Sequence, residues 1–198
     1  MSTLTPEIEH TLRQGFKRFN PFMVAFFRLG LGPLINAWPD VGGRILVLTH
    51  TGRKTGQPRR TPVNYAVVQN DLYITAGFGA AADWYRNILK DPRVEVWLPD
   101  GWWAGVAEDV SESPERLPLL RRVLVASGFA AYAAGVDPRA FDDERLQAVT
   151  ASYRLVRIRR AEARTGSGGP GELSWVWPLA AMGLLPLALR GLWPRRRA

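Results

Sequence analysis

The sequence predicts an α+β fold, in which a barrel or roll of five or six mostly antiparallel strands is flanked by a few helices. Three observations support this prediction. Short stretches of alternating apolar and polar residues recur between residues 44 and 159, and turn residues separate them. Helical stretches interrupt these strands without the regular strand–helix alternation of a parallel sheet. The sequence has no Gly-x-Gly-x-x-Gly motif, which argues against a Rossmann fold.

Residues 1–40 form a predicted helical segment. Aromatic and aliphatic residues recur at helical spacing over Phe16–Ile35, among arginines and a lysine, and Gly30, Gly32 and Pro33 end the pattern. This segment is either a helix that caps the core or a helix that lies on a membrane surface. The residues before Phe16 are polar and of mixed charge, so no cleavable signal peptide is expected.

Residues 41–164 contain the predicted barrel. Its strands are expected at Arg44–Thr51, Thr61–Val68, Asp71–Thr75, Arg93–Leu98, Trp102–Val110 and Tyr153–Arg159. The sequence Pro99-Asp100-Gly101 predicts the turn of a hairpin. Helices are expected at Ala82–Lys90, Pro114–Ala126 and Asp142–Thr150.

The composition excludes several classes of chemistry. The chain has no cysteine, which excludes disulfides, thiolate metal sites and a cysteine nucleophile. Its two histidines, His10 and His50, are too few for a multi-histidine site, so no metal is expected. A serine hydrolase is disfavoured because no Gly-x-Ser-x-Gly motif is present.

The formal net charge of +8 is concentrated near the C-terminus. Residues 151–198 carry nine basic and two acidic side chains, so the preceding part of the chain is nearly neutral. A nucleic-acid-binding domain would instead spread basic charge over its folded surface. No nucleic-acid partner is therefore expected.

The C-terminal part divides into a predicted linker and a tail. Residues 165–172 are rich in glycine and serine, which predicts a flexible linker. The tail, residues 173–198, is apolar up to Leu189 and ends in a basic cluster. A tail of this composition either contacts a membrane or docks on protein, and its apolar stretch is at the short limit for a membrane span.

The most informative stretch runs from Gly52 to Pro62. It holds four cations, two glycines and no acidic residue between two predicted strands. Glycines let backbone amides face a ligand, and arginines grip phosphate or carboxylate oxygens. The alternative is a solvated basic hairpin without a ligand. A Walker phosphate-binding loop does not fit, because the order is Arg-Lys-Thr-Gly and no helix follows.

A second cluster, Asp83–Asn87, places two aromatic side chains, a cation and an amide on one helical turn. The preceding small residues of Ala76–Ala80 would let a flat ring approach the backbone closely. The alternative is that Trp84 and Tyr85 are core aromatics.

Taken together, the ordered motifs LTHTGRKTGQPRRTPV, TAGFG and DWYRNILKDPRVEVWLPDG resemble the deazaflavin (coenzyme F-420)-dependent nitroreductase and oxidoreductase family. The resemblance covers about residues 41–112. It implies a split β-barrel of the FMN-binding type that holds reduced coenzyme F-420, an 8-hydroxy-5-deazaflavin, and transfers a hydride from it. In this family a basic loop holds the phosphate and oligoglutamate tail of the coenzyme.

Carried onto this chain, the resemblance implies three groups of cofactor-binding residues. The basic loop and the following strand contribute Arg53, Lys54, Thr55, Arg59, Arg60, Thr61, Pro62, Val63 and Asn64. The short loop before the helix contributes Thr75, Ala76, Gly77 and Phe78, and the helix contributes Asp83, Trp84, Tyr85, Arg86 and Asn87. Tyr65 and Tyr132 are the candidate catalytic proton donors.

The expected acceptor is a quinone, a nitro compound or an activated alkene. The resemblance implies several tyrosines lining the substrate side, on the helical segment before the last strand, but this chain has only Tyr132 there. Activation of nitroimidazoles is therefore disfavoured. The alternatives are an FMN-binding or haem-binding protein of the same fold and a non-enzymatic lipid- or membrane-binding module. A cytoplasmic protein at the inner face of the membrane, held there by residues 173–198, is expected.

Overall fold

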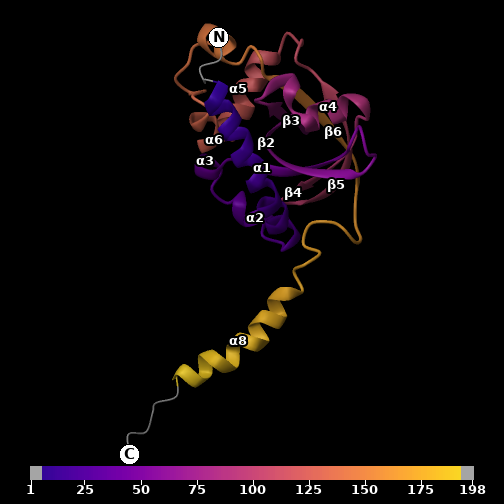
Figure 1. The fold of residues 1–198 in the computed structure, drawn as a ribbon, viewed down its shortest axis with the longest axis vertical. Helices are drawn as coiled ribbons and strands as arrows, with labels where there is room; N and C mark the ends of the chain where they lie inside the picture. Colours follow the sequence, from indigo (N-terminus) through magenta and orange to yellow (C-terminus); the bar gives the residue numbers. More distant parts are fainter. Residues whose placement is uncertain (1–5, 193–198) are drawn as a thin grey trace, which may run out of the picture.

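The computed structural model describes residues 6–192 and confirms the predicted α+β barrel (Figure 1). Its antiparallel strands close into a barrel in the order β1-β2-β3-β6-β5-β4. The strands are β1 (Ile45–Thr51), β2 (Pro58–Val68), β3 (Asp71–Ala76), β4 (Arg93–Leu98), β5 (Gly101–Asp109) and β6 (Arg154–Ala163). Each of the six overlaps a predicted strand, and their bounds differ from the predicted ones by at most four residues.

The helices lie outside the barrel or over its end. They are α1 (Pro6–Arg28), α2 (Gly32–Ile35), α3 (Pro39–Gly42), α4 (Asp83–Lys90), α5 (Arg116–Ala126), α6 (Phe129–Ala133), α7 (Asp143–Val149) and α8 (Val176–Leu192), with a 3-10 turn, η1, at Gly79–Ala81. Helix α5 packs on β2 and β3, and α4 contacts β1 and β5. The short helices α2, α3 and α6 were not predicted as separate elements.

The strands alternate between the interior and the outer face of the barrel. On β1, Leu46 and Leu48 belong to the interior cluster, whereas Val47 packs outward against Phe27 of α1 and Trp97 of β4. A third apolar cluster joins α5 and α7 to the outer face of β3 and β6. Because side chains alternate with a period of two, His50 continues the inward-facing series of β1.

Strand β2 is longer than predicted and part of it has one free edge. It pairs with β1 from Pro58 to Asn64, but its pairing with β3 begins only at Tyr65. Residues 58–63 therefore have no strand neighbour on the β3 side in the described residues. A proline at position 62 is compatible with such an edge, where a missing backbone N–H costs no ladder hydrogen bond.

The segment predicted as a flexible linker is held against the barrel. The backbone N–H groups of Gly171 and Leu173 each donate at 2.8 Å, to the carbonyl oxygens of Phe27 and Arg28. The Arg28 guanidinium also bonds to the Glu172 carboxylate. At Gly169, a Cβ would come within 2.6 Å of Trp102, so the missing side chain lets the segment pack closely instead of giving it freedom.

Helix α8 follows this segment and projects away from the barrel (Figure 1). Its first turn is attached to the residue that follows α1, because Trp177 Nε1 donates to the Leu29 carbonyl oxygen at 2.8 Å. Beyond that point Leu179, Met182 and Leu184 are exposed. Within residues 6–192, no helix combines the length and the apolar character needed to cross a membrane.

Candidate functional site

The loop between β1 and β2 is a compact turn of residues 52–57. The N–H of Gly52 donates to the Gln57 carbonyl oxygen at 2.8 Å, and the N–H groups of Thr55 and Gly56 donate to the Gly52 carbonyl oxygen. Gly56 has a φ of 67°, which glycine adopts without steric cost. The turn leaves Lys54 and Thr55, both predicted cofactor contacts, exposed.

Helix α4 fixes this loop from the side. Asn87 Oδ1 accepts hydrogen bonds from the backbone N–H and from Nη1 of Arg53, at 3.1 and 3.0 Å. Arg53 Nη2 pairs with Asp83 Oδ1 at 2.9 Å, and Lys90 Nζ donates to the Arg53 carbonyl oxygen at 3.0 Å. Arg53, Asp83 and Asn87 were all predicted to bind the cofactor. The structure brings them together, and in it Arg53 forms hydrogen bonds with the other two.

A basic cavity of about 540 Å³ lies beside the loop. The charged residues that line it are Arg53, Lys54, Lys90 and Arg93, with Asp91 as the one acid among them. The hydrogen bonds from Arg93 hold the pKa of Asp91 down to about 2, so its carboxylate stays charged and partly offsets Arg93. The cavity keeps an excess of positive charge and suits a polyanion.

The two arginines that follow on β2 point to opposite faces. Arg59 lies opposite His50 in the β1–β2 register and is exposed. Arg60 lies on the outer face, where its guanidinium stacks on Trp97 at 4.6 Å from the ring centroid and Nη2 donates to the Gly168 carbonyl oxygen. Arg60 therefore holds the C-terminal segment in this structure, whereas Arg59 has no such role.

The free edge of β2 begins where its pairing with β3 ends. Continuing the β2–β3 register places Ala76 level with Val63, so Gly77 and Phe78 come after the point where the two strands separate. Gly77 is exposed and Thr75 Oγ1 donates to the Arg154 carbonyl oxygen at 3.1 Å. By the same register, the predicted strand residues Val63 and Asn64 lie level with the last residues of β3, and Thr61 and Pro62 lie beyond its end.

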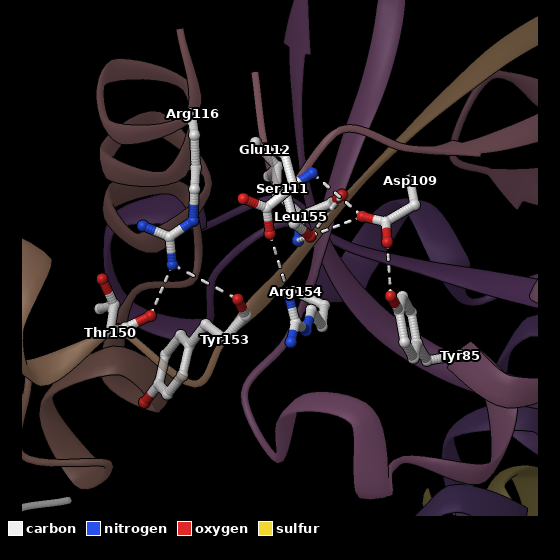
Figure 2. A network of polar contacts seen from close by, with 9 residues as sticks. All are labelled: Tyr85, Asp109, Ser111, Glu112, Arg116, Thr150, Tyr153, Arg154 and Leu155. Atoms are coloured by element: carbon white, nitrogen blue, oxygen red, sulfur yellow. Dashed lines mark hydrogen bonds and ion pairs between the residues drawn. The ribbon is translucent and has the colours of Figure 1, made fainter. Parts of the chain in front are cut away.

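The residues of α4 that were predicted to contact the cofactor lie in different surroundings. Trp84 is partly buried against the interior cluster, and Arg86 Nε donates to the Ala80 carbonyl oxygen at 2.7 Å. Tyr85 is buried, and Figure 2 shows its hydroxyl pointing at Asp109 of β5, to which it donates at 2.5 Å. Burial, together with this hydrogen bond, raises the pKa of Tyr85 to about 12.

Asp109 ties Tyr85 into a network that closes the barrel. Its other oxygen, Oδ1, accepts from the N–H and hydroxyl of Ser111, and Ser111 Oγ accepts from the N–H of Leu155 on β6 (Figure 2). Tyr85 is therefore a core aromatic with a satisfied hydroxyl. Trp84 and Tyr85, the two aromatic residues of this helical turn, both pack against the interior cluster of the barrel.

The two predicted proton donors lie in different surroundings. Tyr65 is buried in the interior cluster with Leu46 and Leu72, and its burial raises the pKa of its phenol. Tyr132 lies on α6 and is 42% exposed. The structure leaves Tyr132 accessible to a ligand and encloses Tyr65.

Sequence reasoning missed three residues of this region. His50 is buried between β2 and α4, and Lys90 and Arg93 line the basic cavity. Two signals could have found them. The alternation of β1 places His50 in the inward series, and helical spacing places Lys90 on the same face as Asp83 and Asn87.

A family match identifies the kind of protein to which this chain belongs. The profile of the family described as F420H(2)-dependent quinone reductase matches residues 23–140. The chain belongs to this family. As a quinone reductase of this family it is an oxidoreductase that uses coenzyme F-420, which confirms the predicted family, enzyme class, cofactor and quinone acceptor. The same match favours the deazaflavin over FMN.

Several solved structures are similar to this quinone reductase. One is a conserved hypothetical protein from Mycobacterium tuberculosis, with 26% identity over 68% of this chain and 80% of that chain and a TM-score of 0.46. Another is an F420-H2 dependent reductase, with 21% identity over 59% of this chain and 94% of that chain and a TM-score of 0.44. A heme binding protein from Mycobacterium smegmatis has 17% identity over 75% and 60% of the two chains and a TM-score of 0.45.

Proposed function

We propose that reduced coenzyme F-420 binds across the opening between the β1–β2 loop, the free edge of β2 and the loop after β3. The observation that carries this proposal is the basic cavity beside the β1–β2 loop, which the loop residues Arg53 and Lys54 help to line. A coenzyme with a flat ring and a polyanionic tail needs both features at once. The free backbone edge suits the ring system, and the excess of cations suits the tail.

Five cations serve the tail in this proposal. Lys54 and Arg59 are exposed and supply flexible charges, whereas Arg53 is fixed by α4 and presents an ordered guanidinium. Lys90 and Arg93 extend the positive surface beyond the loop, and the charge of Arg93 is partly offset by Asp91. We assign the phosphate to the loop and the glutamates of the tail to the cavity.

When bound, the reduced coenzyme supplies a hydride to the acceptor. The residues of the chain bind it, orient it and deliver the proton that the reduced quinone oxygen takes up. Of the two candidate donors we propose Tyr132, because it is accessible on α6, whereas Tyr65 is enclosed and its raised pKa makes it a weaker acid.

The test of this function is a turnover assay with the purified full chain, reduced coenzyme F-420 and menadione, followed by the absorbance of the coenzyme. We expect quinone-dependent oxidation of the coenzyme, and no turnover when NADPH replaces it. Equal or faster turnover with FMN and NADPH would contradict the proposal. Titration with FMN and haem under the same conditions is the control for cofactor selectivity.

We also propose that α8 brings the enzyme to a membrane surface, on the cytoplasmic side, where lipophilic quinones dissolve. The exposed apolar residues of α8 and the tryptophans at its start, Trp175 and Trp177, support this proposal. Tryptophan prefers the lipid headgroup region, and binding at the surface raises the effective concentration of a quinone near the site. Trp193 and Arg195 to Arg197, which we expect to contact anionic lipid, lie outside the described residues.

A further inference from the structure

His50 is a buried titratable side chain at the edge of the proposed coenzyme site. It is 4% exposed and lies in the barrel end that α4 covers. Both of its ring nitrogens have side-chain partners. Nδ1 lies 3.1 Å from Asn87 Nδ2, and Nε2 lies 3.1 Å from Thr61 Oγ1.

The surrounding hydrogen bonds determine which nitrogen carries the proton. Asn87 Oδ1 accepts from the backbone N–H and Nη1 of Arg53, so the orientation of the Asn87 amide is fixed. Its Nδ2 group then donates to His50 Nδ1, which has to be unprotonated. In a neutral ring the proton therefore sits on Nε2, and His50 donates to Thr61 Oγ1.

The ring is neutral at ordinary pH. Burial, reinforced by the charge of Arg59, lowers the pKa of His50 from 6.5 to about 4, against a weaker opposing effect of Asp83. The direction of each hydrogen bond in the series Arg53, Asn87, His50, Thr61 is thus constant across the physiological range.

Thr61 is the end of this series and lies on the free edge of β2. Its oxygen already accepts a hydrogen bond from His50, so the hydroxyl proton is directed to another acceptor. A hydroxyl that accepts one hydrogen bond becomes a better donor of its own, because linked hydrogen bonds polarise one another. An acceptor at this edge would be an oxygen of the bound ligand.

We propose that His50 is a positioning residue for the coenzyme. It holds the Thr61 hydroxyl as a donor toward an acceptor oxygen of the bound deazaflavin and, through Asn87, fixes Arg53 and the basic loop. The inference rests on the proposed location of the coenzyme. One side chain thereby aligns the strand edge with the loop, which are the two halves of the proposed site.

The tautomer is directly measurable, because the chain has only two histidines. In protein labelled with ¹⁵N, the ring nitrogen shifts of a neutral histidine distinguish Nε2–H from Nδ1–H. The His50→Gln variant identifies the His50 signals by their loss. We expect the Nε2–H tautomer at pH 7 with and without the coenzyme. An Nδ1–H tautomer or a protonated ring would overturn the inference.

Coenzyme binding tests the function of the series with matched variants. Thr61→Val removes the hydroxyl, and His50→Asn keeps an amide near the Nδ1 position but loses the donor to Thr61. We expect each to raise the dissociation constant of coenzyme F-420 about tenfold, and the double variant to raise it no further. Thr61→Ser, which keeps the hydroxyl, is expected to bind within about threefold of the natural protein.

Circular dichroism and urea unfolding check that each variant folds. If His50→Asn does not fold, the comparison of Thr61→Val with Thr61→Ser still decides the point. Natural-strength binding by Thr61→Val, or losses that multiply to about a hundredfold in the double variant, would overturn the inference. If the natural protein does not bind the coenzyme at all, the proposed coenzyme site itself is wrong. That outcome is distinct from a failure of the role proposed for His50.

Discussion

Asn87 Oδ1 lies 3.1 Å from the backbone nitrogen of Arg53, so a side chain of α4 holds the main chain of the β1–β2 loop. The same oxygen accepts from Arg53 Nη1 at 3.0 Å. The loop is therefore ordered before any ligand arrives. Such preorganisation reduces the entropy that binding has to offset, and a flexible hairpin with the same charges would lack this advantage.

Replacing Asn87 tests this anchoring. Asn87→Ala leaves the Arg53 N–H and His50 Nδ1 without their buried partner, so we expect the free energy of unfolding to fall by about 1–3 kcal/mol. The matched variant Asp83→Asn weakens only a partly exposed ion pair and is expected to cost less than about 1 kcal/mol. Urea unfolding measures both. Equal losses in the two variants would show that the buried amide has no special role.

Removing loop cations tests the coenzyme site. We expect Lys54→Ala to weaken binding of coenzyme F-420 by about 1.5–3 kcal/mol, the range for hydrogen bonds to charged groups, and added salt to weaken binding by the natural protein. Arg122→Ala on α5 removes the same charge from an exposed position outside the proposed site and is the control. A dissociation constant that is unchanged in Lys54→Ala/Arg59→Ala would refute the role of the loop.

The sequence was sufficient to predict the barrel and its basic loop, because both rest on local patterns. Alternation predicts strands, and the cations of residues 52–62 are adjacent in the chain. The partners of those cations were not predictable, since they lie far along the chain: Asp83 pairs with Arg53, and Gly168 accepts from Arg60. Composition also favoured flexibility for residues 165–172, where Gly169 in fact packs against Trp102.

The lowered pKa of His50 gives a pH dependence of stability. The folded state holds the ring neutral down to about pH 4, whereas the unfolded chain protonates it near 6.5. Between these values the unfolded state binds more protons, so the stability that the neutral ring contributes is present above pH 6.5 and is lost as pH falls. The loss by pH 4 is about 3 kcal/mol.

His50→Gln isolates this contribution, because glutamine does not titrate. We expect the free energy of unfolding of the natural protein to fall more steeply between pH 6.5 and 4 than that of the variant, in parallel urea titrations. Asp91, whose pKa is lowered to about 2, is present in both proteins, so its contribution cancels in this comparison. Parallel pH profiles for the two proteins would contradict a buried neutral His50.

The proton donor is tested by two matched tyrosine variants. Tyr132→Phe removes an accessible hydroxyl, and we expect kcat with menadione to fall at least about a hundredfold if general acid catalysis is lost. Tyr65→Phe keeps the ring in the interior cluster and is expected to retain kcat near that of the natural protein. A large loss of kcat in Tyr65→Phe with none in Tyr132→Phe would reverse the assignment.

Membrane contact is tested by sedimentation with anionic liposomes. We expect the full chain to sediment, because α8 offers exposed apolar area and terminal arginines attract anionic lipid by about 1 kcal/mol each. The structure decides where to truncate. Ending the chain after Trp177 keeps the hydrogen bonds of Gly171, Leu173 and Trp177 to residues 27–29, whereas ending it after Thr165 removes them and is expected to lower stability as well.

The truncation after Trp177 should therefore release the protein from liposomes and leave its activity on a water-soluble quinone largely unchanged. Neutral liposomes are the control for the charge contribution, and we expect weaker sedimentation with them. If the truncated protein still sediments fully, membrane contact belongs to the helical segment Phe16–Ile35, where Phe19 and Phe22 are exposed. A full chain that stays in the supernatant would exclude the membrane proposal, and the quinone would then have to reach the site from solution.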